Sequence, residues 1–126
     1  FMDYSDFIKM YDKCKFIFLP NLTDASPRVL TEAMDYNLPI LVNENILGGW
    51  KYVNEQTGVL FNDGNFENQL DIFIKNLDKY KPREYFINNY GPENSGKRLL
   101  QFVKECIPQD KLNIDLNTIK YLKPGI

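Results

Sequence analysis

The chain alternates short apolar runs with segments of helical periodicity, and this alternation most constrains its fold. Residues 15–20 form one apolar run, which Pro20 ends, and residues 38–42 form a second. Between them, residues 27–36 place apolar side chains at the spacing of one helix face. A third run, Thr57–Phe61, precedes a turn sequence. Strand–helix–strand order with short connections predicts an α/β fold, a parallel sheet flanked by helices.

Helical periodicity recurs on both sides of these runs. It predicts further helices over residues 4–13, 66–77, 82–89 and 95–107. Asn37 stands where a left-handed residue ends a helix. Three strands amount to half of a doubly wound sheet, so we interpret residues 1–126 as a single partial Rossmann-like domain. The weakly patterned stretch 109–126 is interpreted as a C-terminal arm.

The charge balance excludes one class of partner. Seventeen acidic and fifteen basic residues give a net charge of −2, without a block of like charge. A nucleic-acid-binding surface needs clustered basic residues, so we expect no nucleic-acid partner. No segment approaches the roughly 18 apolar residues that span a bilayer, and no signal peptide is visible. We therefore expect a cytoplasmic protein, with peripheral attachment to a membrane left open.

Residues for nucleophilic or metal chemistry are few. The chain has no His, so it cannot build a Ser–His or Cys–His nucleophile pair. Its two cysteines, Cys14 and Cys106, fit no metal-ligand spacing, and no metal site is predicted. Free thiols in a reducing compartment are favoured over a disulfide between them.

Two acids flank the start of the helix predicted after the first strand. Asp24 stands in the turn before the helix, and Glu32 follows eight residues later on the second turn. Ser26 is placed to cap a helix whose first residue is Pro27. A helix N-terminus with free N–H groups attracts phosphate, and a carboxylate beside it can bind sugar hydroxyls. The arrangement suits a nucleotide-sugar.

Each of these charged residues also has a structural interpretation. Arg28 and Glu32 are four residues apart on the helix, a spacing that usually means an exposed salt bridge. Asp24 fits equally well as a simple turn acid. The guanidinium of Arg28 has the geometry to bind a donor phosphate instead.

The loop after the second strand contains Gly48 and Gly49. Adjacent glycines permit close backbone approach or positive φ angles, so this loop is a second candidate for contact with a ligand. Trp50 and Tyr52 follow and are able to stack on a base or sugar. A single Trp in a domain of this size is more often an anchor in a core or an interface.

In this order the residues resemble the donor-binding half of the GT-B glycosyltransferases, close to the large retaining family 4 and its group 1 relatives. The resemblance covers about residues 4–106. It is carried by a strand ending in Leu19-Pro20, an acid separated by seven residues from Glu32-Ala33-Met34, the run Leu38–Val42, the Gly48-Gly49 loop and Thr57–Phe61. Each piece alone is a weak indication, whereas the ordered combination is fairly specific.

The resemblance implies roles for both acids. Glu32 matches the acid that holds the ribose hydroxyls of the nucleotide. Asp24 matches the acid that contacts hydroxyls of the transferred sugar, and it is the candidate for the catalytic region. Most members have Glu at that position, so Asp24 is a departure from the family pattern.

The resemblance also implies that the start of the helix binds the donor. Ala25, Ser26, Arg28 and Val29 match the loop and helix start whose backbone N–H groups face the diphosphate and sugar. Pro27 has no N–H, so the amides of Arg28 and Val29 are the better donors. The family usually has small, Gly-rich residues here, which this chain lacks.

The implied activity is transfer of a sugar from a nucleotide-diphosphate sugar to an acceptor, with retention and without a metal or other cofactor. The acceptor is a glycan, a lipid or a protein. We expect the acceptor-binding domain upstream of Phe1 and expect residues 1–126 alone to be inactive. The strand at 15–20 would then have an unpaired edge, which favours self-association. A non-catalytic binding or assembly module on the same scaffold is the alternative function.

A phosphate-loop motif occurs near the C-terminal end. Gly91–Arg98 matches G-x4-G-K-[ST] except at the last position, where an arginine replaces the Mg²⁺-binding hydroxyl. Residues 83–90 are too polar for the strand that should precede it, and Pro92 removes an N–H group. We interpret the segment as a turn and helix start capped by Asn94 or Ser95, not as a nucleoside triphosphate site.

Overall fold

The computed structural model of the protein describes residues 2–108. The chain divides into two compact units, the first ending at Ile87 and the second starting at Asn88. The predicted arm over 109–126 lies outside the described residues. The interpretation of residues 1–126 as one partial domain stays a prediction.

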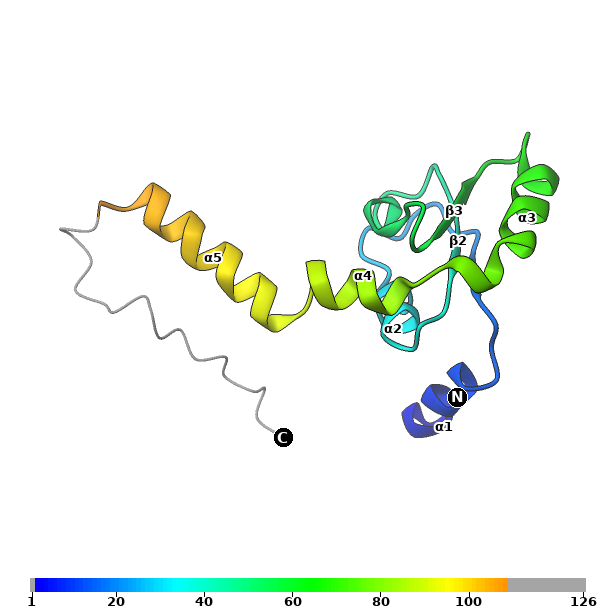
Figure 1. Cartoon of the computed structure of the whole chain (residues 1–126), viewed down its shortest axis with the longest axis horizontal. Coiled ribbons are helices and arrows are strands. Elements are labelled where there is room, and N and C mark those ends of the chain that lie inside the picture. The colour runs from blue at the N-terminus through cyan, green and yellow to red at the C-terminus, as the bar shows by residue number, and fades with distance from the viewer. Residues whose placement is uncertain (1, 109–126) are drawn as a thin grey trace. The chain divides into compact units, whose positions relative to one another are not determined.

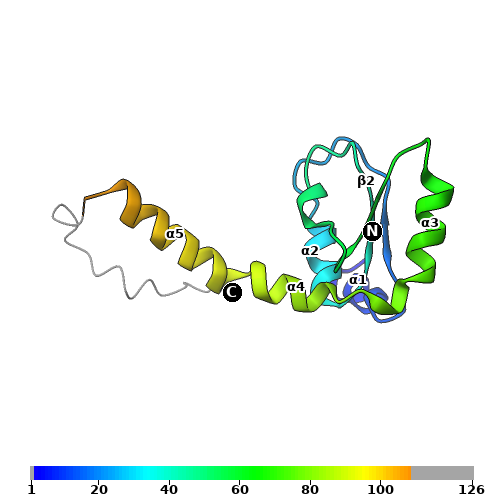
Figure 2. The same cartoon turned by 45° about the horizontal axis from the view of Figure 1, so that its top comes forward.

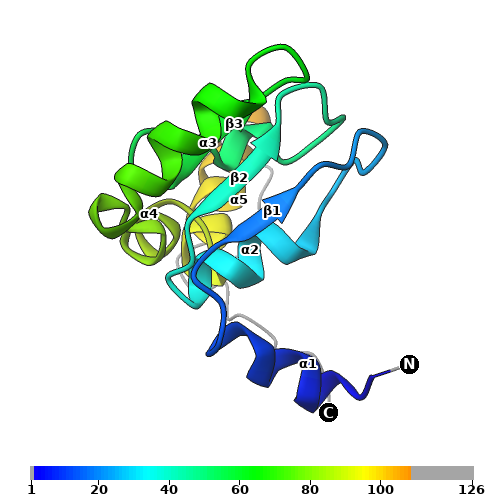
Figure 3. The ribbon, with the colours of Figure 1, turned by 90° about the vertical axis from the view of Figure 1, so that its right-hand side faces the viewer.

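The first unit is built on a sheet of three parallel strands. These are β1 (Ile17–Leu19), β2 (Ile40–Asn43) and β3 (Gly58–Phe61), in the spatial order β1-β2-β3. Figure 3 shows the strands side by side in this order. Every residue of β2 is buried, as expected for a central parallel strand covered on both faces. The predicted strands and the α/β, Rossmann-like fold are confirmed.

Helices flank this sheet, and α2 and α3 cover its two faces. The helices are α1 (Tyr4–Tyr11), α2 (Arg28–Asp35), α3 (Phe66–Lys75) and α4 (Pro82–Asn89), with short 3-10 turns η1 (Trp50–Tyr52) and η2 (Leu77–Lys79). Figure 1 labels the helices along the chain, and Figure 2 shows α2 and α3 on opposite faces of the sheet. The connection from β1 to β2 crosses over through α2, whereas the connection from β2 to β3 passes through the short turn η1.

Two hydrophobic clusters hold these layers together. One lies between the sheet and α2 and contains Leu30, Met34 and the β2 residues Ile40 and Val42. The other lies on the α3 face and contains Leu41, Phe61 and Phe73. Successive residues of β2 point to opposite faces, so this one strand contributes to both clusters.

Asn37 ends α2 in the left-handed conformation that the sequence predicts, with φ of 58°. Its N–H donates to the Met34 carbonyl, and the N–H of Leu38 donates to the Ala33 carbonyl, both at 2.9 Å. This pair of bonds is the Schellman motif. The motif turns the chain from α2 directly into the residues that lead to β2.

The Thr57-Gly58 pair at the start of β3 is buried. The Thr57 hydroxyl donates to the Tyr52 carbonyl at 2.6 Å and accepts the N–H of Asn54 at 2.9 Å. A Cβ atom on Gly58 would lie 1.8 Å from the Ile40 carbonyl oxygen. Contacts within the fold therefore explain why a threonine stands at position 57 and a glycine at position 58.

The second unit contains α5, which runs from Pro92 to Cys106. The predicted start at residue 95 is wrong by three residues, because Pro fits the first position of a helix and extends it toward Gly91. The predicted cap is also wrong. Gly91 occupies the capping position with φ of 91°, and the Asn94 side chain donates to the Tyr90 carbonyl.

Candidate functional site

The candidate site is built by the loops that follow β1 and β2. Because parallel strands end at the same edge of a sheet, these two loops leave the sheet side by side. The N–H of Leu47 donates to the Leu22 carbonyl, and the N–H of Gly48 donates to the Asp24 carbonyl, each at 3.0 Å. The backbone around Asp24 is therefore fixed by the second loop.

Both glycines of the second loop are needed for this contact. A Cβ atom on Gly48 would lie 1.9 Å from the carbonyl oxygen of Ala25. Gly49 has φ of +93°, and a Cβ atom there would lie 2.6 Å from Cγ of Pro27. The predicted close approach and positive φ are confirmed, and the approach is to the chain's own first loop. Contact between these glycines and a ligand stays a prediction.

The start of α2 differs from the sequence prediction. Pro27 is the last residue before the helix, with ψ of 99°, and α2 begins at Arg28. Ser26 does not cap the helix, since no side-chain hydrogen bond is made at its start. Instead the N–H of Ser26 donates to Oδ1 of Asp24 at 2.9 Å. The Asp24 side chain therefore forms a local turn before the helix, and Ser26 takes part in that turn through its backbone.

This start leaves two amides without an acceptor in the helix. Arg28 and Val29 occupy the first two helical positions, whose N–H groups have no acceptor within the helix. The next amide, that of Leu30, donates to the Pro27 carbonyl at 3.2 Å. The two amides that the sequence favours as phosphate donors are therefore the two that α2 itself leaves open.

Glu32 lies one turn further along α2 and is half-buried. Its Oε1 is 3.9 Å from Nη2 of Arg28, whose side chain is 84% exposed. The predicted salt bridge is present, but at this distance and exposure it contributes little to stability. Oε2 of Glu32 accepts a hydrogen bond from the Tyr11 hydroxyl at 3.1 Å.

Tyr11 is a residue of this site that the sequence did not indicate. It lies at the end of α1, 21 positions before Glu32, and its side chain is buried. Burial, followed by the bond to Glu32, raises the pKa of Tyr11 above its usual value. The phenol therefore stays protonated as a hydrogen-bond donor to the carboxylate.

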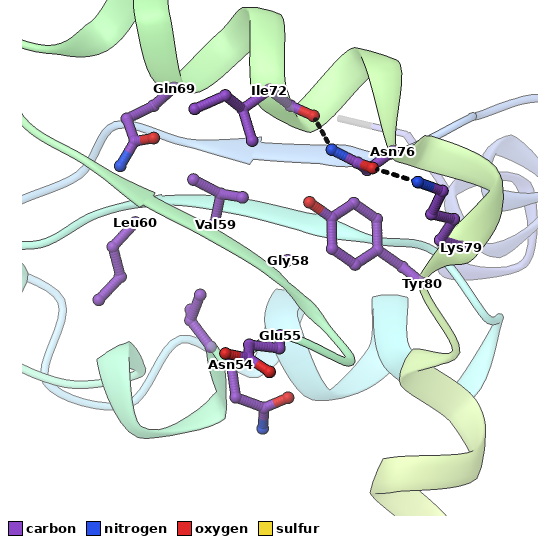
Figure 4. A pocket seen from close by; sticks show the side chains of 11 residues that line it. Asn54, Glu55, Gly58, Val59, Leu60, Gln69, Ile72, Asn76, Lys79 and Tyr80 are labelled. Carbon is purple, nitrogen blue, oxygen red and sulfur yellow. Dashed lines mark hydrogen bonds between the residues drawn. The ribbon is translucent and has the colours of Figure 1, made fainter.

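Two further features lie outside this arrangement. Trp50 is 54% exposed at the start of η1, so it is not a core anchor. Figure 4 shows a groove of about 490 Å³ along β3, lined by Gly58, Val59, Leu60 and side chains of α3 such as Ile72. None of the predicted site residues lines this groove.

Several sequence predictions concern residues that hold ligands or react. Within residues 2–108, no three His, Cys, Asp or Glu residues gather closely enough to hold a metal ion. Cys14 is half-buried and Cys106 is exposed, and both are free thiols, as predicted. In the same range no helix has the length and apolar character to cross a bilayer.

The phosphate-loop motif does not form a loop. From Pro92 on, its residues lie in α5, and Nζ of Lys97 pairs with Oε1 of Glu93 one turn earlier at 2.9 Å. Arg98 donates to the Asn89 carbonyl. A helix cannot wrap its amides around a phosphate, so the residues of this motif do not form the phosphate-binding loop of a nucleoside triphosphate site.

Comparison with known proteins identifies the class to which this arrangement belongs. The family model described as glycosyl transferases group 1 matches residues 1–91. The chain therefore belongs to the group 1 glycosyl transferase family. The match includes the sheet, α2 and both loops of the candidate site. No curated protein and no solved structure gives a significant match.

Proposed function

We propose that this chain provides the donor-binding part of an enzyme that transfers a sugar from a nucleotide-sugar to an acceptor with retention. One observation carries the proposal. The start of α2 presents the open amides of Arg28 and Val29 beside a loop fixed by Gly48, with a half-buried carboxylate, Glu32, one turn away. This juxtaposition supplies donors for a diphosphate and an acceptor for ribose hydroxyls.

The proposed roles follow from the chemistry of each group. Glu32 accepts hydrogen bonds from the ribose, and the amides of Arg28 and Val29 stabilise the charge on the departing diphosphate. Asp24 contacts the transferred sugar, and the backbone of Ala25 and Ser26 lines its path. Catalysis then comes from positioning and from fixed N–H donors, with no need for His or a metal ion in this part.

The remaining parts of the proposal concern partners. The acceptor is a glycan, a lipid or a protein. Within residues 2–108, β1 pairs with a strand on one side only, β2, which supports self-association through the other edge.

The test uses the complete protein and a panel of nucleotide-sugars, screened first by thermal shift and then by turnover. Glu32→Gln should lower kcat/KM for the accepted donor by roughly 10- to 100-fold, because a hydrogen bond to a charged group contributes about 1.5–3 kcal/mol. Asp35→Asn is the matched control, since Asp35 is an exposed acid on the last turn of the same helix.

Two results would contradict the proposal. If no nucleotide-sugar raises the melting temperature, the donor-binding role is wrong. If Glu32→Gln folds and acts like Asp35→Asn, the carboxylate does not bind donor. A folded protein that binds a partner but turns over no nucleotide-sugar would instead be the non-catalytic module.

A further inference from the structure

Tyr11 is held in place by aromatic side chains from two helices. Its ring stacks on Tyr36 of the α2 cap, with centroids 5.0 Å apart and planes inclined by 25°. The edge contact with Phe7 of α1 has a centroid distance of 5.5 Å and an angle of 73°. Only 4% of Tyr11 is exposed, so its ring is fixed and its hydroxyl has a defined position.

That hydroxyl reaches one oxygen of Glu32 and leaves the other available. Oε2 accepts the phenol at 3.1 Å, whereas Oε1 has Nη2 of Arg28 at 3.9 Å, beyond hydrogen-bonding distance. A Glu side chain on a helix surface samples many rotamers, and restricting it to one costs conformational entropy. A bond to a buried, immobile phenol restricts the carboxylate before any ligand arrives.

We infer that Tyr11 is a positioning residue that orients the Glu32 carboxylate so that Oε1 faces the bound nucleotide. The inference rests on the proposed function of Glu32. Tyr11 itself is buried beneath α2 and does not contact the donor. Its contribution is to pre-organise the acceptor atom, which improves affinity without adding a contact to the ligand.

The experiment measures donor kinetics of Tyr11→Phe in the complete glycosyltransferase. Phe keeps the ring contacts with Phe7 and Tyr36 and removes only the hydroxyl. The ribose is remote from the reacting bond, so KM for the donor should rise roughly five- to tenfold while kcat changes little. Tyr36→Phe is the matched control, because it keeps the stacked ring and leaves the Tyr11–Glu32 bond intact.

A double variant separates positioning from a general structural effect. If Tyr11 acts through Glu32, adding Tyr11→Phe to Glu32→Ala, which keeps no oxygen to accept the phenol, should raise KM no further. A further rise of the same size in the double variant would show that Tyr11 acts elsewhere and would overturn the inference. Circular dichroism and thermal unfolding verify that each variant is folded.

The two proposals fail in different ways. If Glu32→Gln leaves donor KM unchanged, the proposed function of Glu32 is wrong. If Glu32→Gln raises KM and folded Tyr11→Phe does not, the function of Glu32 stands and the positioning role of Tyr11 is wrong.

Discussion

The N–H of Gly48 donates to the carbonyl oxygen of Asp24 at 3.0 Å, across the two loops that follow β1 and β2. The loop between β1 and α2, called the β1–α2 loop below, is therefore not a free surface segment. Its backbone position depends on a residue from a loop two elements later in the chain. Four predictions test this arrangement and its neighbours.

Replacement of Gly48 should displace the β1–α2 loop. In Gly48→Ala the new Cβ would lie 1.9 Å from the carbonyl oxygen of Ala25, so the backbone must shift. Overpacking of this kind costs about 1–3 kcal/mol, and urea unfolding should show the loss. Gly96→Ala is the control, because its Cβ meets nothing within 4 Å and Ala favours a helix over Gly. Wild-type stability for Gly48→Ala would contradict the described contact.

Replacement of Thr57 should destabilise the fold without touching the site. Thr57→Val keeps the shape but removes the hydroxyl that donates to the Tyr52 carbonyl and accepts the Asn54 N–H. The loss of a hydrogen bond costs about 0.5–1.5 kcal/mol, which chemical denaturation can measure. Thr23→Val changes an exposed threonine and should alter stability by less than about 0.5 kcal/mol. Equal effects of both variants would argue against the buried hydroxyl network.

The two roles of Asp24 can be separated by substitution. Asp24→Asn keeps an oxygen that can accept the Ser26 N–H but removes the negative charge, whereas Asp24→Ala removes both. If Asp24 contacts the transferred sugar as a carboxylate, both variants should lose activity. Only Asp24→Ala should also lose stability, by about 0.5–1.5 kcal/mol. If Asp24→Asn keeps full turnover, the carboxylate of Asp24 does not contact the sugar, and Asp24 serves only to form the turn.

Tyr11 should make the protein sensitive to alkaline pH. The folded state raises the pKa of Tyr11 through burial and the bond to Glu32, while the unfolded chain loses this proton near pH 10. The stability that the neutral phenol contributes is therefore complete below about pH 10 and declines as the pH rises above it. Between pH 8 and pH 11 the unfolding free energy of Tyr11→Phe should fall less than that of the wild type. An equal fall in both proteins would show that Tyr11 is not the linked group.

Local sequence signals predicted the elements of this fold well. The strands lie within or one residue beyond the apolar runs, since a buried parallel strand needs a short continuous apolar segment. Asn37 was predicted as left-handed because few other residues tolerate that conformation. The predicted starts of α1, α3 and α4, at residues 4, 66 and 82, match the structure, whereas the starts of α2 and α5 differ from it. Asp24 and Pro27 decide where α2 begins, and Gly91 and Pro92 decide where α5 begins, by competing local geometries of similar energy.

The contacts between distant residues were not predictable from the sequence. The bond between Tyr11 and Glu32 joins positions 21 apart, and nothing in the spacing distinguishes Tyr11 from the other apolar residues of α1. The sequence predicted that the backbone at Gly48 can approach another group closely, but it did not predict that this group is Ala25. Both depend on how the layers pack, which a linear pattern does not encode.

The bond between Tyr11 and Glu32 also limits how far the N-terminal end of an expressed protein can be shortened. The chain leaves α1, passes through the sheet as β1 and returns in α2, so the bond closes a loop around the first strand. A shorter piece that begins after α1 would keep all three strands and both acids, yet its Glu32 would have lost the phenol. The donor affinity measured on such a piece should be lower than the donor affinity of the intact protein. Expression boundaries should therefore lie before Tyr4.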